Sequence, residues 1–78
     1  MPTPYAAPVK RSVTIAGHET SLALEPIFWS ALGKAAEEQE LPLNAVIARI
    51  DAERLERSPP ANLASAIRQW LFDRASGR

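Results

Sequence analysis

The 78-residue sequence has no cysteine, a single histidine, three glycines and no net formal charge. It therefore cannot form a disulfide, and one histidine without cysteine cannot make a zinc site of the ordinary ligand count. No apolar run is long enough to span a membrane, and the prolines at positions 2, 4 and 8 do not fit a signal peptide. A neutral chain also lacks the basic field that attracts nucleic acid at long range. We expect a cytoplasmic protein with no metal, no cofactor and no membrane contact, in which any nucleic-acid binding comes from locally placed residues.

The short length limits how stable a lone subunit can be. A domain of this size buries only about 60% of the surface that its unfolded chain exposes. The hydrophobic fraction of 46% is typical of a globular protein rather than a disordered one. Because disulfides and a metal are excluded, oligomerisation is the leading remaining source of stability.

The N-terminal third predicts a flexible arm followed by two strands. Residues 1–8 are rich in proline and alanine, with little to pack. Apolar and polar residues then alternate over 9–15 and again over 19–24, with a turn at 16–18 between them. A lone hairpin is marginal in water, so its apolar side must be covered by the rest of the chain or by a second chain.

Helical periodicity begins at Pro26, a residue favoured at the first helical position. The first helix is predicted to end near residue 39, and a second begins near Leu43 and is stopped by Ser58-Pro59-Pro60. Asn62 is a predicted cap for a third helix. The apolar stripe of this third helix consists of Leu63, Ile67, Trp70 and Leu71.

The stretch "RSVTIAGHETSLALEPIFWSALGKAAEEQELPLNAVIARIDAER" resembles the ribbon-helix-helix family of DNA-binding proteins, the Arc, MetJ and CopG type. Within that family it looks like a short bacterial subfamily with an extra strand before the ribbon. The resemblance implies a mostly helical α+β fold, an intertwined homodimer with an extra N-terminal strand and a C-terminal third helix. The expected organisation is an arm over 1–8, a ribbon-helix-helix domain over 9–58 and a helical extension over 59–78.

The resemblance also implies two groups of functional residues. The dimer core would contain Leu22, Leu24, Phe28, Trp29, Leu32, Val46, Ile47 and Ile50. A two-stranded ribbon fits the DNA major groove, and a helix N-terminus can hold a phosphate. The DNA-binding residues would be Lys10, Arg11, Ser12, Thr14, Glu19, Ser21, Ala23 and Asn44.

Several residues depart from the family pattern. Glu19 directs a carboxylate at a polyanion, Ala23 offers only a methyl group, and Pro42 removes a hydroxyl and an N–H from the expected phosphate clamp. Glu40 stands where such turns usually have glycine. Lys10 and Arg11 can equally be a charged flank that keeps an edge strand soluble.

Two functions follow from these patterns. The first is a sequence-specific, homodimeric transcriptional regulator of double-stranded DNA, a repressor by family analogy. The alternative is an interaction or assembly module that kept the fold but lost DNA binding and uses its third helix for a protein partner or a higher oligomer.

No enzyme is predicted. The carboxylates Glu37, Glu38 and Glu40 have no converging serine, histidine or lysine, and a solvated helix end explains them better. A lone turn histidine such as His18 more often faces water or caps backbone groups than serves a site.

Overall fold

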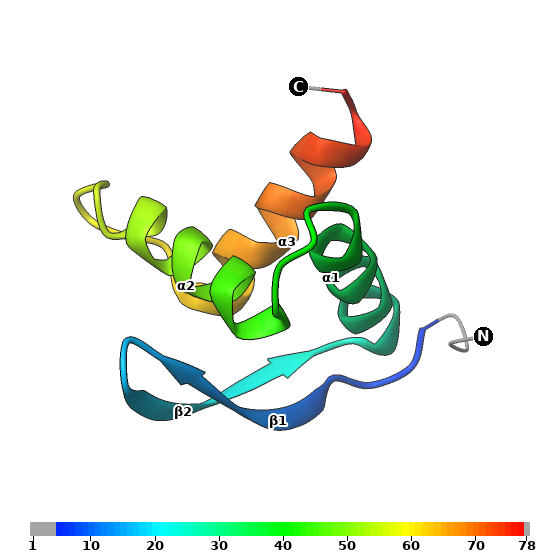
Figure 1. The fold of residues 1–78 in the computed structure, drawn as a ribbon, viewed down its shortest axis with the longest axis horizontal. Coiled ribbons are helices and arrows are strands. Elements are labelled where there is room, and N and C mark those ends of the chain that lie inside the picture. Colours follow the sequence, from blue (N-terminus) through cyan, green and yellow to red (C-terminus); the bar gives the residue numbers. More distant parts are fainter. Residues whose placement is uncertain (1–4, 78) are drawn as a thin grey trace.

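The computed structural model describes residues 5–77, which form a two-stranded antiparallel sheet followed by three helices (Figure 1). This is the mostly helical α+β order that the sequence predicts. Of the arm predicted over 1–8, residues 1–4 lie outside the described residues, and residues 5–8 are in neither strand nor helix. The elements are β1 (Val9–Ile15), β2 (His18–Leu24), α1 (Pro26–Glu38), α2 (Leu43–Arg54) and α3 (Leu63–Ala75).

The hairpin turn contains only two residues, Ala16 (φ 51°) and Gly17 (φ 81°). Positive φ at both central residues is the type I′ arrangement, whose twist matches that of the flanking strands. The expected three-residue turn is therefore wrong by one position: His18 already belongs to β2, where it pairs with Ile15.

The hairpin and the helices form two layers, with all three helices on one side of the sheet (Figure 1). The inner face of the hairpin contributes Val13, Leu22 and Leu24 to the core that these helices complete. The period of two along each strand leaves the alternate residues on the outer face, which no helix of the described chain covers.

Seven of the eight residues predicted for a dimer core are buried within one chain, and Phe28 is partly buried. The third helix supplies much of the cover, through Ile67 (0% exposed) and Leu71 (7% exposed). One chain therefore hides this apolar surface without a second copy, because β1 and α3 add cover to that of the two family helices.

The helix α1 ends close to the predicted residue 39, whereas α2 ends earlier than predicted. In α1 the Leu41 N–H donates to the Ala36 carbonyl and the Glu40 N–H to the Glu37 carbonyl, both at 3.0 Å, which closes the helix as a Schellman motif. In α2 the regular helix ends at Arg54, before the stop predicted at Ser58. The N–H groups of Glu56 and Arg57 bond only three residues back, so the chain continues as turns.

Candidate nucleic-acid interface

The outer face of the hairpin brings together six of the eight residues predicted to bind DNA. The strand register pairs Lys10 with Ala23, Ser12 with Ser21 and Thr14 with Glu19. Directly paired residues of an antiparallel ladder point to the same face, so these three pairs form one surface. We call this surface the outer face. All of its residues are exposed except Ala23, which is partly buried.

The chemistry of the outer face is small and polar. It carries one ammonium, one carboxylate, three hydroxyls and the methyl groups of Thr14 and Ala23, so its formal charge is zero. Hydroxyls donate and accept hydrogen bonds, the ammonium only donates and the carboxylate only accepts. A surface of this composition can contact phosphates and base edges, but it has no large apolar side chain with which to pack on a protein core.

Arg11 lies on the opposite face of β1 from Lys10. It pairs with buried Leu22, and its guanidinium sits 4.8 Å from the centroid of the Trp29 ring. The Trp29 indole N–H donates to the Val9 carbonyl at 2.9 Å, so Trp29 connects the start of β1 to α1. The alternation of β1 predicts this position of Arg11, because Arg11 lies two residues from both Val9 and Val13 and therefore on the same face of the strand.

Asn44 is the second residue of α2 and is exposed, in the helical layer rather than on the outer face. The N-cap of α2 is Pro42, which makes no side-chain cap bond. The Ala45 and Val46 N–H groups bond to the Pro42 carbonyl. The N–H groups of Leu43 and Asn44 have no partner within the helix, as at any helix start.

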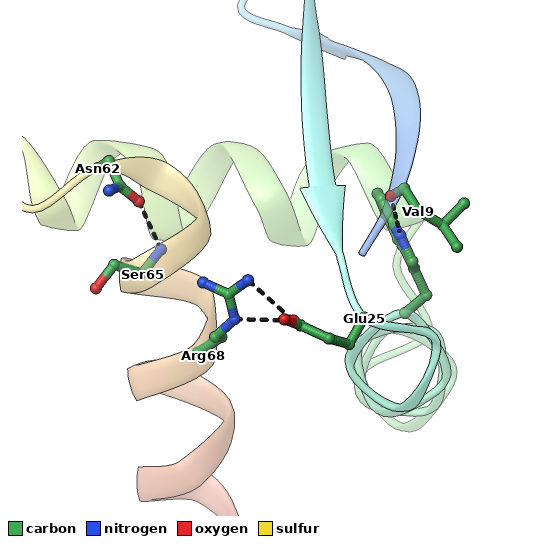
Figure 2. Close-up of polar contacts among 6 residues, drawn as sticks. Val9, Glu25, Asn62, Ser65 and Arg68 are labelled. Carbon is green, nitrogen blue, oxygen red and sulfur yellow. Dashed lines mark hydrogen bonds and ion pairs between the residues drawn. The ribbon is translucent and has the colours of Figure 1, made fainter. Parts of the chain in front are cut away.

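An ion pair joins the end of the hairpin to the third helix. The Arg68 guanidinium donates to one Glu25 carboxylate oxygen through Nε at 3.0 Å and Nη2 at 2.9 Å (Figure 2). It also lies 5.7 Å from the Phe28 ring centroid. A hydrogen bond from its own backbone N–H, and then the Arg68 guanidinium, lower the pKa of the Glu25 carboxyl below its ordinary value of 4.5. The sequence does not predict this pair, because opposite charges 43 residues apart carry no local signal.

The predicted cap of the third helix is confirmed. The Asn62 side-chain oxygen accepts from the Ser65 backbone N–H at 2.8 Å (Figure 2). This cap starts α3 where its apolar side reaches the core, and so helps to hold Arg68 opposite Glu25.

A family model described as ribbon-helix-helix domain matches residues 8–75 of the chain. The chain belongs to the ribbon-helix-helix family. No curated protein and no solved structure matches it. Ribbon-helix-helix proteins are in general DNA-binding regulators, typically without enzymatic activity, and they typically bind DNA as dimers.

In ribbon-helix-helix terms, β2 is the strand that leads directly into the first helix, and α1 and α2 are the helix pair. The family match extends through α3, which shares the core of the preceding elements. Within the described residues β2 pairs only with β1, so its second edge has no backbone partner.

Two further findings concern other kinds of site. Within residues 5–77, no group of three or more histidine, aspartate or glutamate side chains is placed to hold a metal ion. None of the helices described combines the length and apolar character needed to cross a bilayer. His18 is exposed at the start of β2.

Proposed function

We propose that the protein is a homodimeric, sequence-specific DNA-binding regulator of transcription that acts in the cytoplasm and meets DNA with the outer face of its hairpin. The observation that carries this proposal is the outer face itself: an exposed, small and polar sheet surface on a ribbon-helix-helix chain, uncovered by any helix of residues 5–77.

The free edge of β2 supports the dimer. In a hairpin with a two-residue turn, the pair beside the turn exchanges both backbone hydrogen bonds, and such pairs alternate along the ladder. The N–H and C=O groups of Glu19, Ser21 and Ala23 therefore point away from β1. An unpaired edge of this kind favours pairing with another strand. A second copy of β2 is the partner that the family architecture supplies.

Antiparallel pairing of two β2 strands along their full length places Ser21 at the two-fold axis, because it is the middle residue of His18–Leu24. Glu19 of one copy then lies beside Ala23 of the other. Since Ser12 pairs with Ser21 within each chain, four serines form a row across the centre of the four-stranded sheet. The dimer thus doubles the outer face and makes it symmetric.

The outward side chains of β2 suit base edges in the major groove. A carboxylate such as Glu19 accepts from the cytosine amino group, a serine bonds to several bases, and an alanine methyl packs on the thymine methyl. We therefore expect each half-site to contain cytosine and thymine. Because the outer face carries one ammonium group per chain, we also expect few phosphate contacts and a modest dependence of affinity on salt.

Fluorescence anisotropy against a random duplex pool and the gene's own upstream DNA tests the proposal. Ser21→Asp should weaken binding about tenfold or more, because two carboxylates then replace the hydroxyls at the dimer centre, where they repel each other and offer base edges no donor. Ser30→Asp adds the same charge at an exposed position of α1 and should bind as the wild type does. Equal affinities for the two variants, or a wild type that binds no duplex at low salt, would refute the proposal.

One observation favours the alternative of a protein-interaction module. An open groove of about 760 Å³ lies at α2 and α3, with Phe28 and Trp70 in its lining and Phe72 at 68% exposure. Leu71 belongs to the core, so a polar substitution there would disturb the fold rather than an interface. Phe72→Ser is the cleaner test: loss of assembly or partner capture, with DNA binding absent in the wild type, would favour this second function.

A further inference from the structure

We propose that the two strands of the hairpin have different tasks on DNA: β2 reads base edges inside the major groove, while β1 lies at the groove rims and holds phosphates through Lys10, Ser12 and Thr14. This inference rests on the proposed function. The extra strand β1, which the two-stranded ribbon of the family does not need, would thus contact the DNA backbone.

The first argument is the width of the sheet. Neighbouring strands are about 4.8 Å apart, so in the four-stranded dimer sheet the two β2 strands lie about 5 Å apart and the two β1 strands about 14 Å apart. The major groove is about 12 Å wide. The β2 pair fits inside it, whereas each β1 strand meets a wall of the groove, which is where the phosphates are.

The second argument is the chemistry of each strand, which is independent of the width. Every outward side chain of β1 carries an N–H or O–H donor, as a phosphate oxygen requires: Lys10, Ser12 and Thr14. On β2, Glu19 offers only acceptors, Ala23 offers no polar group, and Ser21 both donates and accepts. A carboxylate beside a phosphate is repelled, but a carboxylate beside the cytosine amino group is bonded. Apart from the Ser21 hydroxyl, the outward donors thus lie on β1, the strand that meets the walls, and the carboxylate lies on β2, the strand that enters the groove.

The third argument is how firmly the start of β1 is held. Lys10 stands between Val9, whose carbonyl accepts from the Trp29 indole at 2.9 Å, and Arg11, whose guanidinium lies over the same ring. Both neighbours of Lys10 therefore contact Trp29 of α1 on the inner side of the sheet. The Lys10 backbone is therefore held in position, and its side chain is directed outward from a fixed point.

The test measures affinity against salt concentration for a preferred duplex and a shuffled duplex of the same composition. Lys10→Ala should weaken binding to both duplexes by the same factor, and should reduce the salt slope by about 2 per dimer, since two phosphate contacts are lost. Lys34→Ala, which removes an exposed lysine from α1, should change neither quantity. Thr14→Val keeps the shape of the side chain and removes the donor, so it should also weaken both duplexes equally.

Glu19→Gln tests the other strand. Glutamine bonds in a bidentate manner to adenine, whereas glutamate accepts from cytosine, so selection from a random pool should replace a cytosine by an adenine at one position of each half-site. Circular dichroism and thermal unfolding confirm that each variant is folded. A changed base preference in Lys10→Ala, an unchanged salt slope in that variant, or an unchanged preference in Glu19→Gln would overturn the inference while leaving DNA binding established. A wild type that binds no duplex would overturn both proposals.

Discussion

Among residues 5–77, two of the three non-glycine residues with left-handed backbone lie where one element of the fold reverses into the next. Ala16 (φ 51°) is the first residue of the hairpin turn, and Glu40 (φ 55°) follows the end of α1. A side chain in this region costs roughly 1–2 kcal/mol because its Cβ approaches the next carbonyl oxygen. Glycine escapes this contact, which is why it is the common residue at a helix C′ position.

Glu40→Gly should raise the free energy of unfolding by about 0.5–1 kcal/mol, since relief of the left-handed strain exceeds the added entropy of the unfolded chain. Urea unfolding followed by circular dichroism measures the change. Glu40→Gln removes the charge but keeps the Cβ, so it should leave stability within about 0.5 kcal/mol of the wild type. A gain in Glu40→Gln equal to that in Glu40→Gly would show that charge, not backbone strain, sets the effect.

The Glu25–Arg68 pair predicts a dependence of stability on pH. The folded-state pKa of Glu25 is lowered, so the folded protein favours the charged carboxylate. Its contribution to stability is complete above the ordinary carboxyl value of 4.5 and is lost as pH falls through the lower folded-state value. Thermal unfolding of the wild type and Glu25→Gln at pH 7 and pH 3 measures this. The difference between the two proteins should shrink at pH 3, and an equal difference at both values would contradict the assignment.

At the scale of elements, the sequence predicts the order and type of all five, because each has a clear period of two or of three to four. Pro26 and Asn62 also mark the starts of α1 and α3 correctly. The packing of α3 could not be predicted in the same way. An apolar stripe shows that something must cover a helix, but it does not identify the cover, and here Ile67 and Leu71 join the core of their own chain.

The contrast between Ile67 and Phe72 tests this packing. Ile67 is fully buried and Phe72 is largely exposed, five residues further along the same helix. Ile67→Ala should lower the free energy of unfolding by about 2–5 kcal/mol. Phe72→Ala should change it by no more than about 0.5 kcal/mol. Denaturant unfolding compares the two, and similar losses would mean that α3 does not pack as described.

For the candidate site, the sequence predicts which face of the hairpin each strand residue occupies, because side chains alternate between the two faces. It does not predict contacts between different elements. Counting alternate residues from buried Val13 and Leu22 separates Ser12, Thr14 and Ser21 from the core. The same count, applied to Arg11, would have placed it on the inner face. Its contact with Trp29 was beyond prediction because it joins two elements whose mutual placement comes only from the fold.

At the scale of the whole molecule, one chain already has a buried core, so the proposed dimer rests on the unpaired sheet edge and the outer face rather than on a shared core. The pairing of the two β2 strands across the two-fold axis is therefore the feature of the proposed dimer that most needs a test. Because the chain has no cysteine, a single introduced cysteine reports on that pairing without interference.

Ser21→Cys should form a disulfide-linked dimer under mild oxidation. Residues in a hydrogen-bonded antiparallel pair have Cα atoms about 5.5 Å apart, within the range that a disulfide spans. Ser12→Cys is the matched control, since the two copies of Ser12 would lie about 14 Å apart, three strand spacings across the sheet. Non-reducing electrophoresis should show a dimer for the first variant only. Equal crosslinking of both, or of neither, would refute pairing centred on Ser21.

The most direct test of the central claim is an NMR titration of the isotope-labelled protein with a selected duplex. If the hairpin meets DNA as proposed, the largest shift changes will fall on the outer face, at Lys10, Ser12, Thr14, Glu19, Ser21 and Ala23, while Phe72 and its neighbours on α3 stay unchanged. Changes confined to α3, or none at any residue, would contradict the account and direct attention to a protein partner.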